Sequence, residues 1–242
     1  MSTSTSEKGH AKNIANLKLL ITHITEIGAN YNPSNPNITL DILQSIYDKA
    51  HLKQINVNTL QGPYKTAVAE RENLFKPLNR LITKLRRVYK ATQGVQPNQL
   101  ENFMTIARKI KGDRKQENPE STDTTTAQTQ YSVSQLSYDQ RTNSLGLLIG
   151  LLNTTTNYNP NEDAYKTTTL QTLQDEMLEK TAAVGATFVP FNNARSIRNS
   201  QLYFDTNNLV DTAYTAKDYL FTILDTSSTQ YKAISKIKFS RI

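Results

Sequence analysis

The sequence repeats itself at an offset of 127 residues, and this repeat limits the possible folds more than any other feature. Tyr31-Asn32-Pro33 recurs as Tyr158-Asn159-Pro160. Over the ungapped stretch from Tyr31 to Arg71, eleven of forty-one positions carry the same residue type in residues 158–198. Self-similarity of this kind is typical of chains built from copies of one structural unit. We therefore expect a tandem duplication of a unit of roughly a hundred residues.

Apolar residues in each copy recur with helical spacing. Ile14, Leu17, Leu20, Ile21 and Ile24 are three or four residues apart, which places them on one face of a helix. The same spacing predicts further helices over residues 39–60, 67–88 and 100–110, and four corresponding helices in the second copy. We expect an all-α protein in which each copy is a four-helix bundle, the two bundles being related by pseudo-symmetry.

Glycine and proline predict where these helices end. Gly62-Pro63 favours a tight turn between the second and third helices, and Pro190 occupies the matching position of the second copy. Pro77 should bend the third helix, and residues 205–208 interrupt the corresponding helix at the same level. The pattern predicts nine buried side chains: Leu20, Leu43, Ile46, Leu78, Leu81, Leu147, Leu170, Leu173 and Leu209.

Composition sets the boundaries of the two copies. Residues 1–9 are polar and are expected to be disordered, and residues 115–136 are rich in Thr, Ser and Gln, which favours a flexible linker. The first unit is expected over residues 10–114, which we call repeat A. The second is expected over residues 137–242, which we call repeat B.

Several short stretches carry a resemblance to known sequences. They are the GHAKNIAN of residues 9–16, the YNPSNPNI of residues 31–38, the spaced Pro63, Ala67 and Arg71, and the TQYKAISKIKF of residues 229–239. Together they resemble a family of uncharacterised bacterial tandem-repeat helical proteins. The resemblance covers nearly the whole chain and implies the two-copy organisation, but it implies no activity.

Candidate catalytic and metal-binding residues are few. The chain has no cysteine and only three histidines, at positions 10, 23 and 51. His23 with Glu26, and Asp48 with His51, share a helix face without ligands from a facing helix, so they are interpreted as surface pairs. None of the common catalytic or phosphate-loop motifs is present. We expect a protein that is not an enzyme and that has no catalytic residues, metal site or cofactor.

The longest strongly apolar run, Leu145–Leu152, has eight residues, far fewer than the roughly 20 that span a bilayer. No signal peptide precedes the first helix, so a soluble, cytoplasmic protein without membrane contact is expected. Gly146 and Gly150 within this run would let another helix approach closely. The favoured interpretation is a contact where the two copies meet, with a partner helix or a membrane as alternatives.

Two cations in each copy fall on apolar helix faces. Lys53 and Arg71 lie nine residues before and nine residues after Gly62, and Lys180 and Arg198 are their copies. In a hairpin turning at Gly62-Pro63, both cations would reach the same level and repel each other unless an anion lay between them. The four residues are candidate contacts for an anion or an acidic partner. The alternatives are that their stems pack while their charges reach solvent, or that Asp48 or Asp175 neutralises them.

Positive charge is concentrated in repeat A. The chain carries a net charge of +7, and residues 1–114 contain 17 Lys and Arg against 8 Asp and Glu. Arg80, Lys84 and Arg87 share one helix face, which could follow a phosphate backbone. The candidate nucleic-acid face also includes residues of the fourth helix: Arg108, Lys109 and Lys111.

These observations predict a non-enzymatic helical scaffold or protein-interaction protein with an unidentified protein partner. The alternative is a nucleic-acid-associated protein that uses the basic face of repeat A. The sequence leaves the oligomeric state open.

Overall fold

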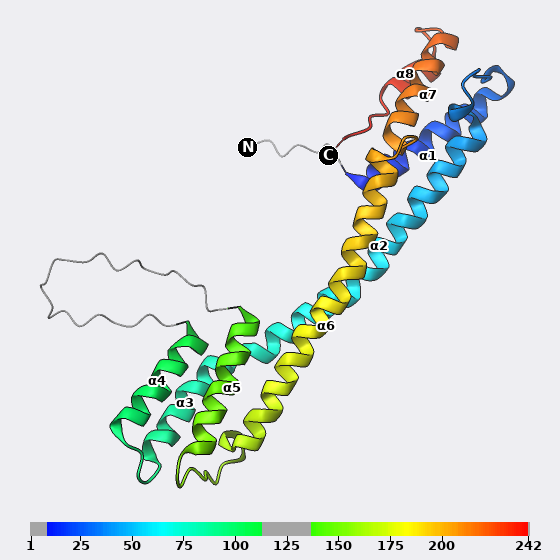
Figure 1. Cartoon of the computed structure of the whole chain (residues 1–242). Coiled ribbons are helices and arrows are strands. Elements are labelled where there is room, and N and C mark those ends of the chain that lie inside the picture. The colour runs from blue at the N-terminus through cyan, green and yellow to red at the C-terminus, as the bar shows by residue number, and fades with distance from the viewer. Residues whose placement is uncertain (1–8, 113–136, 242) are drawn as a thin grey trace, which may run out of the picture. The chain divides into compact units, whose positions relative to one another are not determined.

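The computed structural model describes residues 9–112 and 137–241, which form helices joined by turns (Figure 1). These described ranges contain no β-strand, so the protein is all-α, as the apolar periodicity predicts. The disorder expected for residues 1–9 (apart from Gly9) and the linker expected at 115–136 lie outside the described residues. The helices are α1 (His10–Ile27), α2 (Leu40–Phe75), α3 (Leu78–Ala91), α4 (Pro97–Lys111), α5 (Tyr138–Thr154), α6 (Thr167–Asn199), α7 (Leu209–Ile223) and α8 (Thr229–Ser235), with 3₁₀ turns η1 (Gly28–Asn30), η2 (Pro36–Ile38) and η3 (Asp163–Tyr165) and a π-helical segment η4 (Ser200–Phe204).

The chain folds into two compact units whose boundaries fall inside α2 and α6. Unit 1 comprises Met1–Tyr64 and Thr187–Ile242, and unit 2 comprises Lys65–Ala186. This division differs from the expected one, in which residues 10–114 and 137–242 form separate bundles. Each compact unit instead combines the first half of one repeat with the second half of the other.

Unit 1 has α1 at its centre, packed against α7 and α8. The predicted apolar face of α1 is buried throughout and meets residues of α2, η2, α7 and α8 in one core. Members of this core from the rest of the unit include Tyr31, Ile38, Leu43, Ile46, Leu209, Leu220, Ile234 and Phe239.

Side chains of α1 and α7 hold the segment that follows α8. Ile237 and Phe239 are buried, whereas Lys238 between them is exposed, so the segment alternates as an extended chain does. Each carbonyl of residues 237–240 accepts a hydrogen bond from a helix side chain. These bonds are Lys217 to Ile237, Asn16 to Lys238 (2.6 Å), Tyr214 to Phe239 (2.6 Å) and Asn13 to Ser240 (2.8 Å).

Unit 2 packs α5 against α4 and α4 against α3. Pro97 is the first residue of α4, where a missing N–H costs nothing, and Gln96 and Gln99 form a capping box around it. Gly112 ends α4 with a φ of 75°, a conformation that glycine adopts without strain. The core of this unit comes from α2, α3, α4, α5 and α6 and includes Phe75, Leu78, Leu85, Tyr89, Phe103, Leu145, Leu148 and Met177.

The predicted turn at Gly62-Pro63 is wrong, because α2 continues through both residues. A proline inside a helix removes one backbone hydrogen bond. The apolar face nevertheless continues across it, since Val57, Leu60 and Tyr64 pack together against Phe191 of α6. Pro190 is likewise inside α6. The interruption predicted near Pro77 is confirmed as a break between α2 and α3, and its counterpart is η4 with the turn that follows it.

Buried positions of the two repeats correspond, with one shift from the predicted register. In α2 and α6 they correspond at the offset of 127, as for Leu43 and Leu170 or Val57 and Val184. The buried residues of α1 correspond to those of α5 at an offset of 128, which pairs Leu20 with Leu148. Leu147 is therefore 53% exposed rather than buried, because the connection after α5 is one residue shorter. The third helices shift further, with Leu78 matching Leu209.

Most of the predicted core is confirmed: Leu20, Leu43, Ile46, Leu78, Leu170 and Leu209 are buried. Leu81 and Leu173 are only partly buried and pack at the margin of the unit 2 core. In both repeats the tyrosine of the Tyr-Asn-Pro motif makes the same local bond. The Tyr31 hydroxyl donates to the Ile38 carbonyl at 2.6 Å, and the Tyr158 hydroxyl donates to the Tyr165 carbonyl at 2.7 Å.

Candidate functional site

Helix α3 of unit 2 carries its apolar and cationic residues on opposite faces. One face is buried in the core and consists of Leu78, Ile82, Leu85 and Tyr89. The three cations predicted to share a face, Arg80, Lys84 and Arg87, are all exposed. The buried face fixes the helix to unit 2, so the cations stand on a rigid element.

The chain segment around these cations contains no negatively charged residue. Residues 73–100 contain six Lys and Arg and no Asp or Glu. Within the described residues, no carboxylate forms an ion pair with any cation of α3. A helix face with several like charges and no counter-charge raises the local positive potential. We call the exposed side of α3 formed by Arg80, Lys84, Arg86, Arg87 and Lys90 the α3 basic face.

The end of α4 lies close to the start of α3. Arg141 of α5 joins them, since its Nε donates to the Ile110 carbonyl at 3.0 Å and its Nη2 donates to Asn79 Oδ1 at 2.9 Å. Lys109 and Arg80 are the chain neighbours of these two acceptors. The predicted cations Arg108, Lys109 and Lys111 therefore lie at the same end of the α3–α4 pair as Arg80. Lys109 is exposed, and the other two are half-buried.

The predicted pairing of Lys53 with Arg71, and of Lys180 with Arg198, is wrong. Because α2 and α6 continue through Pro63 and Pro190, the members of each pair are eighteen residues, or about five turns, apart on one helix. Lys53 and Arg198 belong to unit 1, and Arg71 and Lys180 belong to unit 2. Each compact unit therefore contains one lysine and one arginine of the set, taken from different repeats.

In unit 2 these cations find partners inside the unit. Lys180 Nζ forms an ion pair with Glu70 Oε2 at 3.0 Å. The Arg71 guanidinium lies over the ring of Tyr138, with 3.9 Å between its central carbon and the ring centroid. Arg71 Nε is buried without a hydrogen-bond partner in the described chain, so stacking on Tyr138 is its main interaction.

In unit 1 the corresponding cations contact neutral amides. Lys53 Nζ donates to Gln201 Oε1 at 2.9 Å. Arg198 is 95% buried, and it donates to Asn199 Oδ1 at 2.8 and 3.1 Å and to Gln54 Oε1 at 3.4 Å. Burial lowers the pKa of Arg198 from its usual value, while Tyr203 acts to raise it and Arg195 to lower it. The described residues provide no carboxylate partner for this buried charge.

Two residues that lie near Arg198, His10 and Tyr203, were not predicted from the sequence to belong to this site. His10 Nδ1 is 2.9 Å from the Tyr203 hydroxyl, which also accepts a hydrogen bond from Asn13. Burial lowers the pKa of His10, and the charges of Arg198 and Arg195 lower it further. Asn13 is a polar residue on the apolar face of α1, and this was the available signal that α1 makes a polar contact there.

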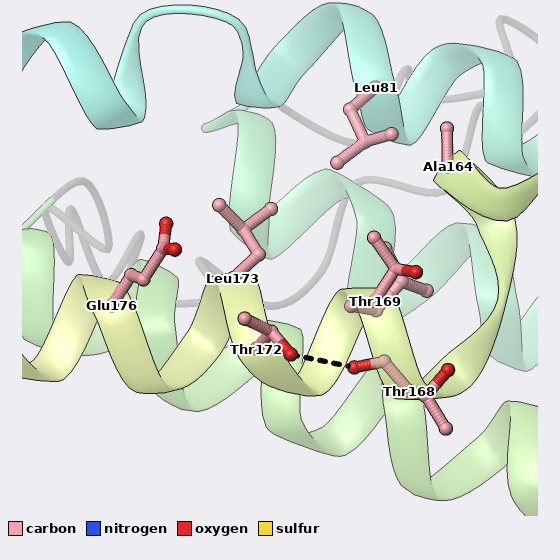
Figure 2. Close-up of a pocket in the computed structure, with 8 residues that line it drawn as sticks. Leu81, Ala164, Thr168, Thr169, Thr172, Leu173 and Glu176 are labelled. Atoms are coloured by element: carbon pink, nitrogen blue, oxygen red, sulfur yellow. Dashed lines mark hydrogen bonds between the residues drawn. The ribbon is translucent and has the colours of Figure 1, made fainter.

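A groove in unit 2 has a volume of about 480 Å³ and is lined by Leu81 and by residues of η3 and α6. Figure 2 shows threonines and Glu176 along it, with Thr172 bonded to the Thr168 carbonyl at 3.2 Å. In the described chain no hydrogen bond joins a threonine hydroxyl of the groove to the Glu176 carboxylate, so the groove shows no paired nucleophile and base.

The other predicted surface features are accounted for locally. His23 Nδ1 lies 3.9 Å from Glu26, and the His51 ring stacks on Tyr47. No group of three potential metal ligands occurs within residues 9–112 and 137–241.

A Cβ added at Gly146 would collide with the Gln174 side chain of α6. The close approach at Gly146 is therefore between α5 and α6 inside unit 2, and not a contact where the two copies meet.

None of the described helices is long and apolar enough to cross a membrane. Comparisons with known proteins identified no relative: no protein-family model matches the chain, and no curated protein or solved structure matches it significantly. The resemblance to a bacterial tandem-repeat family therefore stays a prediction.

Proposed function

We propose that this is a non-catalytic binding protein that attaches to the phosphate backbone of nucleic acid through the α3 basic face. The observation that supports this most directly is the row of exposed cations on α3, for which the described residues supply no carboxylate partner. Lys and Arg bind phosphates by charge and release condensed counterions, so such a surface supports binding without sequence specificity.

The position of the apolar residues favours nucleic acid over a lipid surface. Helices that lie on membranes insert an apolar face among the lipids, whereas the apolar face of α3 is covered by the core of unit 2. The row from Arg80 to Arg87 is about 10 Å long at a rise of 1.5 Å per residue. That length corresponds to roughly three base-pair steps along a duplex.

The experiment is a salt-dependent binding titration with labelled duplex and single-stranded oligonucleotides. We expect affinity to fall steeply with salt, and the combined change of Arg80, Lys84 and Arg87 to Gln to make the slope of log K against log salt less negative by roughly 3. A matched control changes the exposed Lys49, Lys232 and Lys236 to Gln, which removes the same charge elsewhere. Absence of binding at low salt, or an equal loss in the control, contradicts the proposal.

Unit 1 supports a second candidate, a protein-interaction or scaffold role. Leu52 and Ile55 are on one face of α2 and are 65% and 46% exposed. Exposed apolar neighbours of this kind are typical of protein contacts when they form a continuous patch. If the protein-interaction role is the right one, we expect the nucleic-acid titration to be negative and the binding of a protein partner to depend on Leu52.

We also propose that the fold arose by tandem duplication, with the second halves of the two repeats exchanged between the compact units. This origin is supported by the matching burial of α1 and α5 and by the hydrogen bond that the tyrosine makes in both Tyr-Asn-Pro motifs. In unit 1, α1 of repeat A packs on α7 of repeat B, and in unit 2, α5 of repeat B packs with α4 of repeat A. Exchange of identical elements is the principle of domain swapping, here within one chain.

A further inference from the structure

The corresponding cations of the two units differ in their partners: a carboxylate in unit 2 and neutral amides in unit 1. In unit 2, Lys180 of α6 is paired with the Glu70 carboxylate of α2 at 3.0 Å, and Glu70 directly precedes Arg71. In unit 2 a carboxylate of α2 thus pairs with the lysine of the facing helix α6. The positive charge of this pair is partly neutralised inside the unit.

In unit 1, neither Lys53 nor Arg198 forms an ion pair with a carboxylate of the described residues. The residue that directly precedes Arg198 is Ile197, which occupies the position of Glu70 in the repeat. Lys53 of α2 donates to Gln201 of η4, and Arg198 of α6 donates to Gln54 of α2, so the two cations lie within about a turn of each other on facing segments. Only amide oxygens of the described chain face them.

One further cation, Arg195, adds to the positive potential at this level. Arg195 is exposed and lies one turn before Arg198 on α6. The charges of Arg195 and Arg198 both act on His10 of α1. A buried guanidinium is costly unless an opposite charge compensates it, and every ionisable group described near Arg198 is cationic, neutral or a tyrosine.

We propose that unit 1 binds an oxyanion, a phosphate or sulfate group, between Lys53 and Arg198, in the role that the Glu70 carboxylate has in unit 2. Three N–H groups of Arg198 are used by Asn199 and Gln54, which leaves two of its five donors. Guanidinium and ammonium donors together match the geometry and charge of an oxyanion. This site lies in unit 1 and does not depend on the α3 basic face.

The test measures the melting temperature in sodium phosphate and in sodium chloride at equal ionic strength. A ligand that binds only the folded state stabilises it by mass action. We expect phosphate to raise Tm by about 2–8 °C over chloride, with saturation at high concentration. The Arg198→Met and Lys53→Met variants should lose this difference.

Ile197→Glu provides the decisive variant, because it is expected to fold and to supply the missing carboxylate. Ile197 is 53% exposed, so the substitution buries no charge. We expect its Tm in chloride to exceed that of the native chain and its response to phosphate to disappear. Glu70→Gln in unit 2 is the matched control and should keep at least the full phosphate response, because it leaves Lys53 and Arg198 unchanged. An undiminished phosphate response in Ile197→Glu, or equal Tm values of the native chain in both salts, overturns the proposal.

A second readout follows the His10 imidazole by NMR titration. Neutralisation of Arg198 and Arg195 by a bound anion should raise the pKa of His10. An unchanged His10 titration in phosphate contradicts the site.

Inorganic phosphate and a nucleoside monophosphate are compared in the same titrations. Tighter binding of the monophosphate indicates a phosphate carried by a larger molecule, and equal binding indicates the free ion.

Discussion

At the scale of single residues, the fold depends on polar side chains that bond to the backbone of non-helical segments. Tyr31 and Tyr158 bridge the loops that follow α1 and α5 and bond to carbonyls seven residues further on. Burial raises the pKa of both hydroxyls to about 12, and for Tyr31 the neighbouring Tyr219 adds to the effect. Because these hydroxyls are more acidic in the unfolded chain, at about 10, their contribution to stability depends on pH.

We expect Tyr31→Phe to lower the free energy of unfolding by about 0.5–1.5 kcal/mol at neutral pH, because the Ile38 carbonyl loses its donor. The raised pKa makes this stabilisation complete below about pH 10 and lost as the pH rises through about 12. The variant should therefore lose less stability than the native chain over that interval. Denaturant titrations at several alkaline pH values measure the difference. The control is Tyr64→Phe, and an identical alkaline loss in native chain and Tyr31→Phe would count against the assignment.

At the scale of elements, the uninterrupted α2 is the feature that decides the fold. Local signals at Gly62 and Pro63 predict a turn, whereas the apolar spacing of Val57, Leu60 and Tyr64 continues through them. In the structure the packing of that face on α6 outweighs the lost hydrogen bond of Pro63. The helix thus contains a weak point at the level where a hairpin would otherwise close.

Replacing the helix breakers should stabilise the protein if α2 is continuous. Pro63→Ala restores the backbone bond to Thr59 and should raise the free energy of unfolding by roughly 1–3 kcal/mol. Gly62→Ala should add up to about 1 kcal/mol, since an added Cβ meets nothing within 4 Å. Gly28→Ala is the contrasting change, because its φ of 62° strains any other residue. A destabilised Pro63→Ala in denaturant titrations would instead support a turn at this position.

The helices and most of the core could be predicted from sequence, because periodic apolar residues define buried faces locally. Leu20, Leu43 and Leu209 are buried as predicted. Leu147 was misplaced because a one-residue change in a loop leaves no mark on the helix itself. The partners of Lys53 and Arg71 could not be predicted for a different reason. Similar repeats offer similar faces, so the local pattern cannot decide whether α1 packs on a helix of its own repeat or of the other.

At the scale of the whole molecule, each compact unit is built from segments of both halves of the chain. Unit 1 needs α1 from repeat A and α7 from repeat B, and unit 2 needs α4 from repeat A and α5 from repeat B. A cut between the repeats would therefore leave each unit with helices from both fragments. If each repeat instead formed a bundle of its own, the same cut would release two independent bundles.

We therefore expect a chain cut between Thr124 and Thr125 to remain one particle. A protease site inserted there allows the cut in the folded full-length protein. The two fragments should elute together in gel filtration at the size of the uncut protein and separate only in denaturant, because both cores contain helices from each fragment. The uncut protein with the same insertion is the control. Separate elution of the fragments under native conditions would contradict the exchanged arrangement.

Unit 1 consists of two separate chain segments, so it can be completed only after unit 2 has been synthesised on the ribosome. Its two segments are separated in the chain by residues 65–186, which form the whole of unit 2. At a synthesis rate of about 5–20 residues per second, that interval takes about 6–24 s. During this time Leu17, Leu20 and Ile24 of α1 have been translated, but α7 and α8, which cover them, have not. The nascent chain therefore carries an uncovered apolar helix while unit 2 is synthesised, and this is the period in which it most needs protection from aggregation.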